Sequence, residues 1–540
     1  MAVRLLLASV LVGSVSAQFP RACAHADALK SQTCCPVWER DGSACGEKSG
    51  RGSCQSPAGA QAPRYSGRDF RMAWPSTFYR RLCFCKGPFS GFDCGECQEG
   101  RWGPQCRRRH LTVRRGLHEM SRAEQRRFVE RLVLAKSTVS RRYVILVSRN
   151  TSDAGSAKFR NASVYDVCTW VQYMAAKPIR TKEEPNFAHM GPAFAVWHRR
   201  YLLFFEREMR HLTGDQEFFL PYWNWTLSPT CDICTDGLMG RNGPSGALLP
   251  PSPFANWELL GRGSEEGVSA AVTVIPPPLQ TLCTYDGGDE DNFHLLCPGP
   301  TAGKTLLTRN PGGDRRAARL PPASDIWKCL QLRRFDSFPF NQYAPFSFRN
   351  SIEGFKDASH PGRQMISLHN QVHLYLNGTI SQVPVASNDP IFMIHHAFID
   401  KILEDFLRAD SRRLEMYPTH QRVSHGHRPN DYMVPFLPLV RNIDYFTYTI
   451  NFAYTYTNAA YTEEDKFSSA ANLDLIPRWR PFYQEWFLKY GVSRAFGGKL
   501  GRGLAGRCGG CSPPAAPLTR RRTRGDPGPG PQLPAAIASQ

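Results

Sequence analysis

The sequence has no run of about 18 or more consecutive apolar residues, so no segment is long enough to span a membrane as a helix. It shows no internal repeat of fixed period, which excludes a repeat architecture. It also lacks the basic, aromatic-interleaved stripe of nucleic-acid-binding proteins. Its net charge of +20 is partly local, since residues 491–540 hold eight Arg and Lys against one Asp. The charge therefore indicates a basic protein and no nucleic-acid partner.

The composition is that of a folded protein. Of the 540 residues 41% are hydrophobic and 11% aromatic, enough to bury a sizeable core, which excludes wholesale disorder. The length suits about three or four domains at ~150 residues each.

The N-terminal sequence predicts that the protein enters the secretory pathway. Residues 1–17, MAVRLLLASVLVGSVSA, have the pattern of a secretory signal peptide cut before Gln18. In an oxidising lumen, the ten cysteines between Cys23 and Cys106 are predicted to form disulfides, with zinc at Cys94-x-x-Cys97 as the weaker alternative. Four glycosylation sequons agree with the secretory route: Asn150, Asn161, Asn224 and Asn377.

The amino-acid composition of the chain changes near residue 109. Residues 18–109 are rich in Gly and Cys, and the cysteine spacing from Cys83 to Cys106 resembles a small epidermal-growth-factor-like module. Residues 461–540 are basic and, from Gly497, rich in Pro and Gly, and are expected to be largely disordered without a transmembrane helix.

Between these segments, residues 110–460 predict a mainly α domain of four core helices with long loops. A capping box at Ser121–Glu124 opens an amphipathic helix with Phe128, Leu132 and Leu134 expected on one side. Further helices are expected over Tyr165–Ala176, His198–Leu212, Met365–Leu376 and Phe392–Leu407.

The first histidine cluster has the spacing of a metal site. His369 and His373, at i and i+4, lie on one helix face and can reach one ion. A second helix carries His395 and His396, with Asp400 one turn later as a carboxylate that could orient the His396 imidazole. Two histidines at this spacing are often merely solvated, but together the two elements form a strong signal.

The second cluster is Asn186-Phe-Ala-His189 followed by Trp197-His198-Arg199. His189 precedes a turn at Gly191-Pro192, and His198 is expected to open an apolar helix. Composition alone favours a partly buried histidine that caps a helix, so this cluster by itself does not establish a metal site.

From about Phe19 to Thr457 the ordered motifs resemble the tyrosinase family of vertebrate pigment cells. They include FAH, WHR, LTGD, PYWNW, CDICTD, SLHN, NDPIF, HHAF and YMVPF, together with the cysteine-rich module. His395 favours the tyrosinase branch, because the tyrosinase-related proteins have an apolar residue at that position.

The resemblance implies a four-helix bundle that holds two copper ions, each bound by three imidazoles, which use O2 to oxidise phenols and catechols. By motif, His369, His373 and His396 match the ligands of the second copper, and His189 and His198 match two of the three ligands of the first. His395 and Asp400 would lie outside this ligand set.

The family pattern also implies how the substrate is handled. Glu353 and Asn370 match a pair that orients a water, which takes the proton of the incoming phenol. Phe355 and Val383 are expected to shape the substrate pocket.

The chain departs from the family at the first copper. Where the family reads Trp-x-His-Tyr, this chain has Trp170-Val-Gln172-Tyr173. An amide oxygen is a poorer copper ligand than an imidazole, so the first site is expected to be weak or empty and monophenol hydroxylation impaired. Leu259–Gln280 also has no counterpart in the family pattern.

A second departure concerns location. Relatives end in a transmembrane helix, and here residues 478–540 take its place, so the form given is expected to be soluble or secreted, with the melanosome lumen implied by resemblance.

The favoured hypothesis is a copper enzyme that converts tyrosine or dopa to dopaquinone in melanin synthesis, in possible association with related melanosomal proteins. A zinc-dependent dopachrome tautomerase and a non-catalytic lumenal protein are the alternatives.

Overall fold

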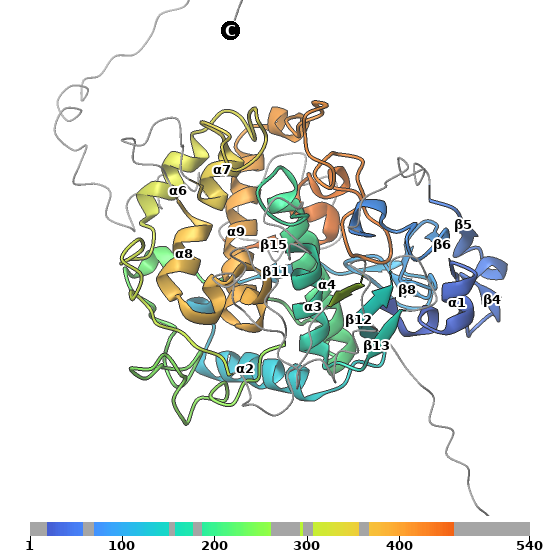
Figure 1. Ribbon diagram of the computed structural model, residues 1–540, viewed down its shortest axis with the longest axis horizontal. Coiled ribbons are helices and arrows are strands. Elements are labelled where there is room, and N and C mark those ends of the chain that lie inside the picture. The colour runs from blue at the N-terminus through green and yellow to red at the C-terminus, as the bar shows by residue number, and fades with distance from the viewer. Residues whose placement is uncertain are drawn as a thin grey trace, which may run out of the picture. The chain divides into compact units, whose positions relative to one another are not determined.

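The computed structural model describes residues 19–57, 70–150, 157–176, 186–260, 292–294, 306–355 and 367–457 (Figure 1). The chain separates into two compact units, Met1–Tyr490 and Gly491–Gln540, and every described residue belongs to the first. The predicted signal peptide, most of Leu259–Gln280 and the basic C-terminal segment lie outside the described residues.

Helices are the larger part of the regular structure in the described ranges. Among the described residues the α-helices are α1 (Ala26–Lys30), α2 (Arg122–Ser137), α3 (Val164–Ala176), α4 (Ala193–Thr213), α6 (Ala323–Leu330), α7 (Phe348–Glu353), α8 (His369–Leu376) and α9 (Ile391–Arg408).

Helix α2 begins with the predicted capping box. The Ser121 hydroxyl accepts from the Glu124 amide, and the Glu124 carboxylate accepts from the Ser121 amide at 2.8 Å. Phe128 and Leu132 are buried as expected, but Leu134 is 43% exposed. The prediction for Leu134 was wrong because position 135, at i+7 from Phe128, faces the core instead of position 134.

Helix α4 starts at Ala193, five residues before the predicted His198. The ring of Pro192 fixes φ at −54°, close to the helical value, so the helix begins directly after it. The helix ends at Gly214, whose left-handed φ of 70° closes the last turn. His198 therefore lies inside the helix and not at its start.

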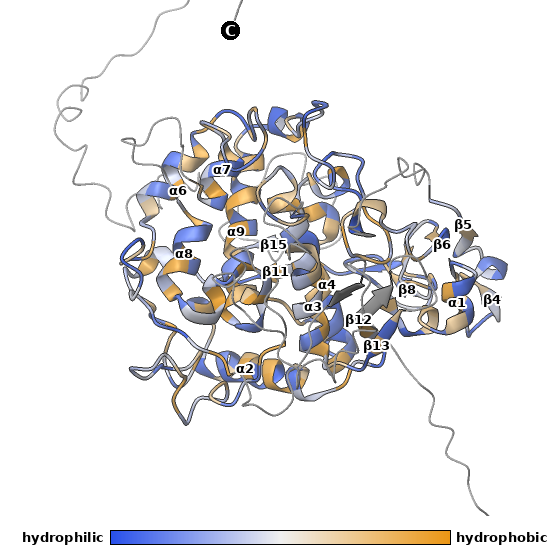
Figure 2. Cartoon of the chain, in the orientation of Figure 1, coloured by the Kyte–Doolittle hydropathy of each residue, from blue (hydrophilic) through white to orange (hydrophobic). Residues whose placement is uncertain are grey.

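Helices α3, α4, α8 and α9 lie side by side (Figure 1). Helix α4 packs against α3 and α9, and α8 packs against α9 and α7. Helices α3 and α9 are buried along almost their whole length, whereas the peripheral α2 mixes hydrophilic and hydrophobic residues (Figure 2). Within the described ranges, no helix is both long and apolar enough to cross a membrane.

The strands are short. β11 (Thr112–Arg114) pairs in parallel with β15 (Tyr454–Tyr456), Thr112 opposite Tyr454, and so joins the two ends of the helical region. β1 (Phe19–Pro20) and β13 (Lys158–Arg160) flank β12 (Tyr143–Asn150), which also pairs with β14 (Asn292–His294). The N-terminal strands are β2 (Thr33–Cys34), β3 (Val37–Trp38), β4 (Ser43–Ala44), β5 (Gly52–Gln55), β6 (Arg81–Cys85), β7 (Phe89–Ser90), β8 (Glu96–Cys97), β9 (Arg101–Trp102) and β10 (Arg108–Arg109).

The N-terminal cysteines are all paired. This confirms the disulfide prediction and rules out zinc at Cys94 and Cys97, because oxidised sulfurs offer no thiolate. The pairs are Cys23–Cys34, Cys35–Cys54, Cys45–Cys83, Cys85–Cys94 and Cys97–Cys106, with Cys231–Cys234 further along the chain.

Ion pairs join this cysteine-rich segment to α4. Glu96 lies 3.7 Å from Arg207, and Glu99 lies 3.7 Å from Arg200, with both arginines on α4 and little exposed. The segment is thus fixed to the helix that carries His198.

Candidate metal centre

Five buried imidazoles meet between α4, α8 and α9. His198 lies on α4, His369 and His373 on α8, His396 on α9, and His189 in the loop before α4. Ring centroids are 4.1 Å apart for His198–His396, 4.3 Å for His369–His373, 4.7 Å for His369–His396 and 4.9 Å for His189–His198. The structure thus brings together the five histidines that the sequence singled out.

Four of these rings are held at Nδ1 by an oxygen that can only accept a hydrogen bond. Each such Nδ1 therefore carries the proton, and each Nε2 keeps a free lone pair. The pairs are His198 with the Phe194 carbonyl (2.8 Å), His373 with the Ile380 carbonyl (2.5 Å), His189 with Asn186 Oδ1 (3.2 Å) and His369 with Asn370 Oδ1 (2.9 Å).

The Nε2 atoms have the arrangement of metal ligands. His198 Nε2 and His373 Nε2 have no hydrogen-bond partner among the described residues. His369 Nε2 lies 3.2 Å from His396 Nε2, close to the ~3.3 Å that separates two imidazole nitrogens on one tetrahedral ion. Copper suits such a set of nitrogens, and the orphaned buried lone pairs fit a bound cation.

Burial keeps these rings neutral. It lowers the pKa of His198 to about 3 and that of His373 to about 4, although a backbone hydrogen bond opposes the shift in each. The pKa values of His189, His369 and His396 are also lowered, first by burial and then by neighbouring histidines. Neutral imidazole is the form that binds metals.

His395 lies beside the three histidines of α8 and α9. His369, His373, His395 and His396 each offer a nitrogen, and these four nitrogens lie within 4.8 Å of one another. His395 is fully buried, and its ring centroid is 5.0 Å from that of His373 and 5.2 Å from that of His369. The sequence placed it outside the ligand set, but the structure places it within the cluster.

Gln172, at the position of the sixth ligand, is fully buried on α3 and its amide group is already bonded. Its Nε2 donates to the Val383 carbonyl at 2.7 Å, and its Oε1 accepts from the Ser387 hydroxyl at 3.3 Å. In the described part of the chain it makes no hydrogen bond to any of the five imidazoles. Its polar atoms face the short 3-10 helix Val383–Asn388.

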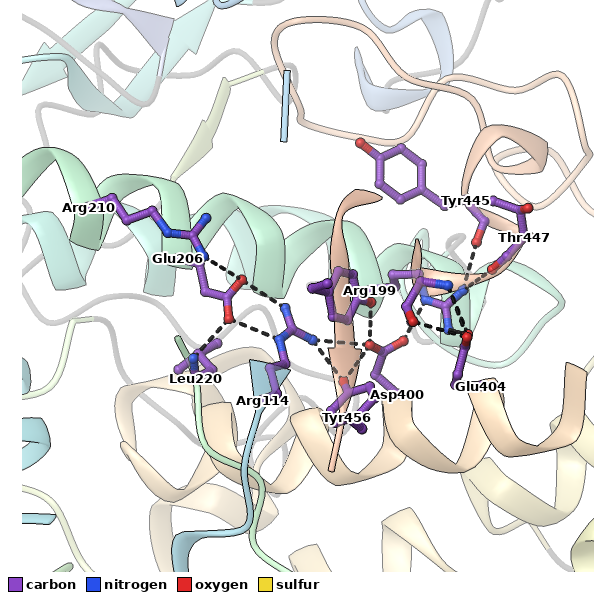
Figure 3. Close-up of polar contacts among 12 residues, drawn as sticks. Arg114, Arg199, Glu206, Arg210, Leu220, Asp400, Glu404, Tyr445, Thr447 and Tyr456 are labelled. Carbon is purple, nitrogen blue, oxygen red and sulfur yellow. Dashed lines mark hydrogen bonds and ion pairs between the residues drawn. The ribbon is translucent and has the colours of Figure 1, made fainter. Parts of the chain in front are cut away.

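Asp400 does not orient His396, contrary to the sequence prediction. Arg199 donates to its Oδ1 at 2.6 Å, and Arg114 and Tyr456 donate to its Oδ2 at 3.1 and 2.6 Å (Figure 3). The Nδ1 of His396 has no hydrogen-bond partner anywhere in the described chain. Two buried arginines outcompete a neutral imidazole for this carboxylate.

Burial acts to raise the pKa of Asp400, but Arg199 and Arg114 outweigh it and hold the pKa below its ordinary value. Asp400 is therefore an ionised member of a buried salt-bridge network that joins α4 and α9.

Glu353 and Asn370 come together around His369. The Glu353 backbone carbonyl lies 3.3 Å from His369 Nδ1, beside the Asn370 side chain. The Glu353 carboxylate accepts from the Met190 amide at 2.5 Å and from Arg349 at 3.0 Å. Burial raises the pKa of Glu353 to about 7, although Arg349 opposes the shift.

The two expected pocket residues, Phe355 and Val383, are both half-buried. Val383 is the first residue of the short 3-10 helix, and its backbone carbonyl accepts the hydrogen bond from the Gln172 side-chain amide. No ring or hydrogen-bond contact in the described chain joins either side chain to the histidines, so their pocket role stays a prediction.

Sequence reasoning missed two residues that position the His189 loop. Asn186 Oδ1 accepts from the backbone and the ring of His189. His427 accepts from the Ala193 amide at 3.2 Å and donates to the Asn186 carbonyl at 2.7 Å. The Asn three residues before His189 is a recognisable turn signal, but nothing near His427 in the sequence indicates its role.

The lowered pKa of buried His427 predicts that the folded protein loses stability in acid. Burial lowers its pKa to about 4, so below about pH 6.5 the unfolded state binds a proton that the folded state does not. Its contribution is intact above about pH 6.5 and is lost as the pH falls toward 4. Between pH 7 and pH 5, metal-free protein should lose about 2 kcal/mol of unfolding free energy through this group.

Denaturant titration at both pH values measures the effect. His427→Gln keeps an acceptor and a donor but does not titrate, so its loss between pH 7 and pH 5 should be smaller by that amount. Equal losses in the two proteins would contradict the assignment.

Of the sequons, Asn161 is exposed, whereas Asn224 and Asn377 are half-buried and use their Oδ1 atoms to accept local hydrogen bonds. The side chain of Asn150 lies outside the described residues. Glycosylation at all four stays a prediction.

The described residues form a buried group of neutral histidines on packed helices, which is the donor set of a candidate metal centre. The family model described as the common central domain of tyrosinase matches residues 162–409. Tyrosinase of Felis catus is 39% identical over 472 residues, covering 83% of each chain, and 5,6-dihydroxyindole-2-carboxylic acid oxidase of Bos taurus is 37% identical over 470 residues, covering 82% of each. The solved structure of a polyphenol oxidase from Thermothelomyces thermophila is similar to the chain at 18% identity, covering 64% of this chain and 88% of that one, with a TM-score of 0.41.

The chain belongs to the tyrosinase family, as the extent of its identity to these relatives shows. Members of this family are oxidoreductases that bind a pair of copper ions and oxidise phenols, so the predicted enzyme class is confirmed.

Proposed function

We propose that the protein is a copper-dependent enzyme that oxidises phenols and catechols, tyrosine or dopa to dopaquinone, in melanin synthesis. The convergence of five neutral imidazoles carries this proposal, together with the buried Nε2 atoms of His198 and His373, which have no hydrogen-bond partner in the described ranges. When bound, copper would supply the binding of O2 and the oxidising power for a phenolic substrate.

The chain's own residues have distinct roles in this proposal. His369, His373 and His396 would hold the second copper, and His189 and His198 would hold the first. The Nδ1 hydrogen bonds fix the orientation of four of these rings, all except His396, before metal arrives, which lowers the cost of binding.

Substrate handling would involve Glu353 and Asn370. The Glu353 backbone carbonyl and the Asn370 side chain both contact His369 Nδ1. A water held by the Glu353 carboxylate and Asn370 would be positioned to take the proton from a phenol hydroxyl. Phe355 and Val383 would shape the pocket that holds the substrate ring.

We further propose that Gln172 leaves the first copper short of a ligand, so that phenol oxidation is impaired. The hydrogen bonds of its amide to Val383 and Ser387 support this, because a copper ion would have to displace them. The same observation favours a second candidate, a non-catalytic lumenal member of the family.

The finer architecture is also a proposal. The packing of α3, α4, α8 and α9 supports a four-helix bundle, and the cysteine pairs Cys85–Cys94 and Cys97–Cys106 support an epidermal-growth-factor-like module. Domain limits at residues 17, 109 and 460 stay predictions. The disulfides fit a lumenal or secreted protein, and we place it in the melanosome lumen, in association with related melanosomal proteins.

Catechol oxidation by the copper-loaded full chain tests the proposed activity. We expect slow conversion of dopa to an o-quinone with O2 uptake, lost in His369→Ala because the second site loses a ligand. His420→Ala, a change at an exposed histidine, is the matched control and should oxidise dopa like the parent. Complete inactivity of the copper-loaded parent would contradict the proposal and favour the non-catalytic candidate.

A further inference from the structure

His395 is a buried polar side chain without a hydrogen bond. It is fully buried on α9, and neither ring nitrogen makes a hydrogen bond of normal geometry within the described ranges. Only the backbone of His369 lies close enough to oppose, in part, the effect of burial on its pKa. An unsatisfied buried imidazole destabilises a metal-free protein, so a leucine of similar volume would pack here at less cost.

The surroundings of His395 point to a cation as its missing partner. Its ring centroid lies 5.0 Å from that of His373 and 5.2 Å from those of His369 and His396. All four side chains offer nitrogens within one 4.8 Å group. Trp225, with its ring centroid at 6.4 Å, is the other aromatic neighbour and offers the ring no acceptor.

The two halves of the centre therefore differ in ligand supply. On the side of α8 and α9 four imidazoles surround one position, whereas His189 and His198 face the position where Gln172 supplies no imidazole. Four nitrogens complete the tetragonal plane that copper(II) prefers, which leaves no strong equatorial position for a further ligand.

We propose that this chain holds a single copper ion with four imidazoles, those of His369, His373, His395 and His396, and that His395 is the fourth ligand that closes the site. The inference rests on the proposed weakness of the first copper site. It adds a reason for slow oxidation, because a fourth imidazole would compete with O2 and substrate for the strong positions on the ion.

Copper binding by the full chain tests this with His395→Leu and, as a matched surface control, His420→Leu. Loaded with Cu(II), the parent should bind one ion and show the paramagnetic resonance spectrum of an isolated Cu(II) with four nitrogen ligands. In His395→Leu the nitrogen splitting should change to that of three imidazoles, and the Kd for copper should rise at least ~10-fold. His420→Leu should match the parent in both measurements.

Thermal melting separates the effect of His395 on copper binding from its effect on the stability of the metal-free fold. Without metal, His395→Leu should melt at or above the temperature of the parent, because it removes an unsatisfied buried group. With copper it should melt below the parent, because it gains less from the ion.

The outcomes separate this inference from the proposal beneath it. Two coppers per chain with no resonance signal, as in a coupled pair, would show that the first site is filled and would overturn both. One copper per chain with an unchanged spectrum and Kd in His395→Leu would overturn only the role of His395.

Discussion

Gln172→His should raise the copper content of the purified protein from about one to about two ions per chain and increase dopa oxidation by ~10–100-fold or more. The new ring can donate its Nδ1–H to the Val383 carbonyl, which now accepts from the Gln172 amide. Its Nε2 would then be free for the metal, as in the four rings that are already held at Nδ1. Copper analysis and O2 uptake measure the two effects.

Gln172→Ala is the control for this substitution. It removes the same two hydrogen bonds without supplying an imidazole, so its copper content should stay at the parent's level. If the alanine variant also gained copper, release of the Val383–Asn388 helix would be the cause, and not ligation. Two coppers in the unmodified protein would contradict the weakness of the first site.

The histidine constellation was predictable because its signals are local. The i, i+4 spacing of His369 and His373 fixes one helix face, and the structure places both rings 4.3 Å apart. The family motifs then identified which other histidines meet them.

What sequence reasoning misjudged or missed at the site depends on partners distant in sequence. The spacing of His396 and Asp400 predicted a carboxylate that orients the imidazole. The Asp400 carboxylate instead accepts a hydrogen bond from Arg114, nearly three hundred residues earlier in the sequence. His427 supports the His189 loop from across a gap of more than two hundred residues. Helical periodicity holds no information on such contacts, which arise only when the helices pack.

Arg114→Met should lower the free energy of unfolding by about 3–5 kcal/mol, as expected when one partner of a buried ion pair is removed. Arg114 is fully buried on β11 and donates to both oxygens of Glu206 on α4, at 2.9 and 3.0 Å, and to Asp400 on α9 at 3.1 Å (Figure 3). Its guanidinium also lies 3.9 Å from the Tyr454 ring centroid. The side chain therefore joins the helices that carry His198 and His396.

Denaturant titration measures this loss, with Arg412→Met as the control. Arg412 pairs with Asp410 at 2.6 Å, but its side chain is 83% exposed, so its removal should cost less than about 1 kcal/mol. The double variant Arg114→Met/Glu206→Leu should recover part of the loss, because no uncompensated Glu206 charge stays buried. A single variant that unfolds like the control would mean that the network contributes little. Copper retention should fall together with stability, because Asp400, which Arg114 contacts, lies on α9 with His395 and His396.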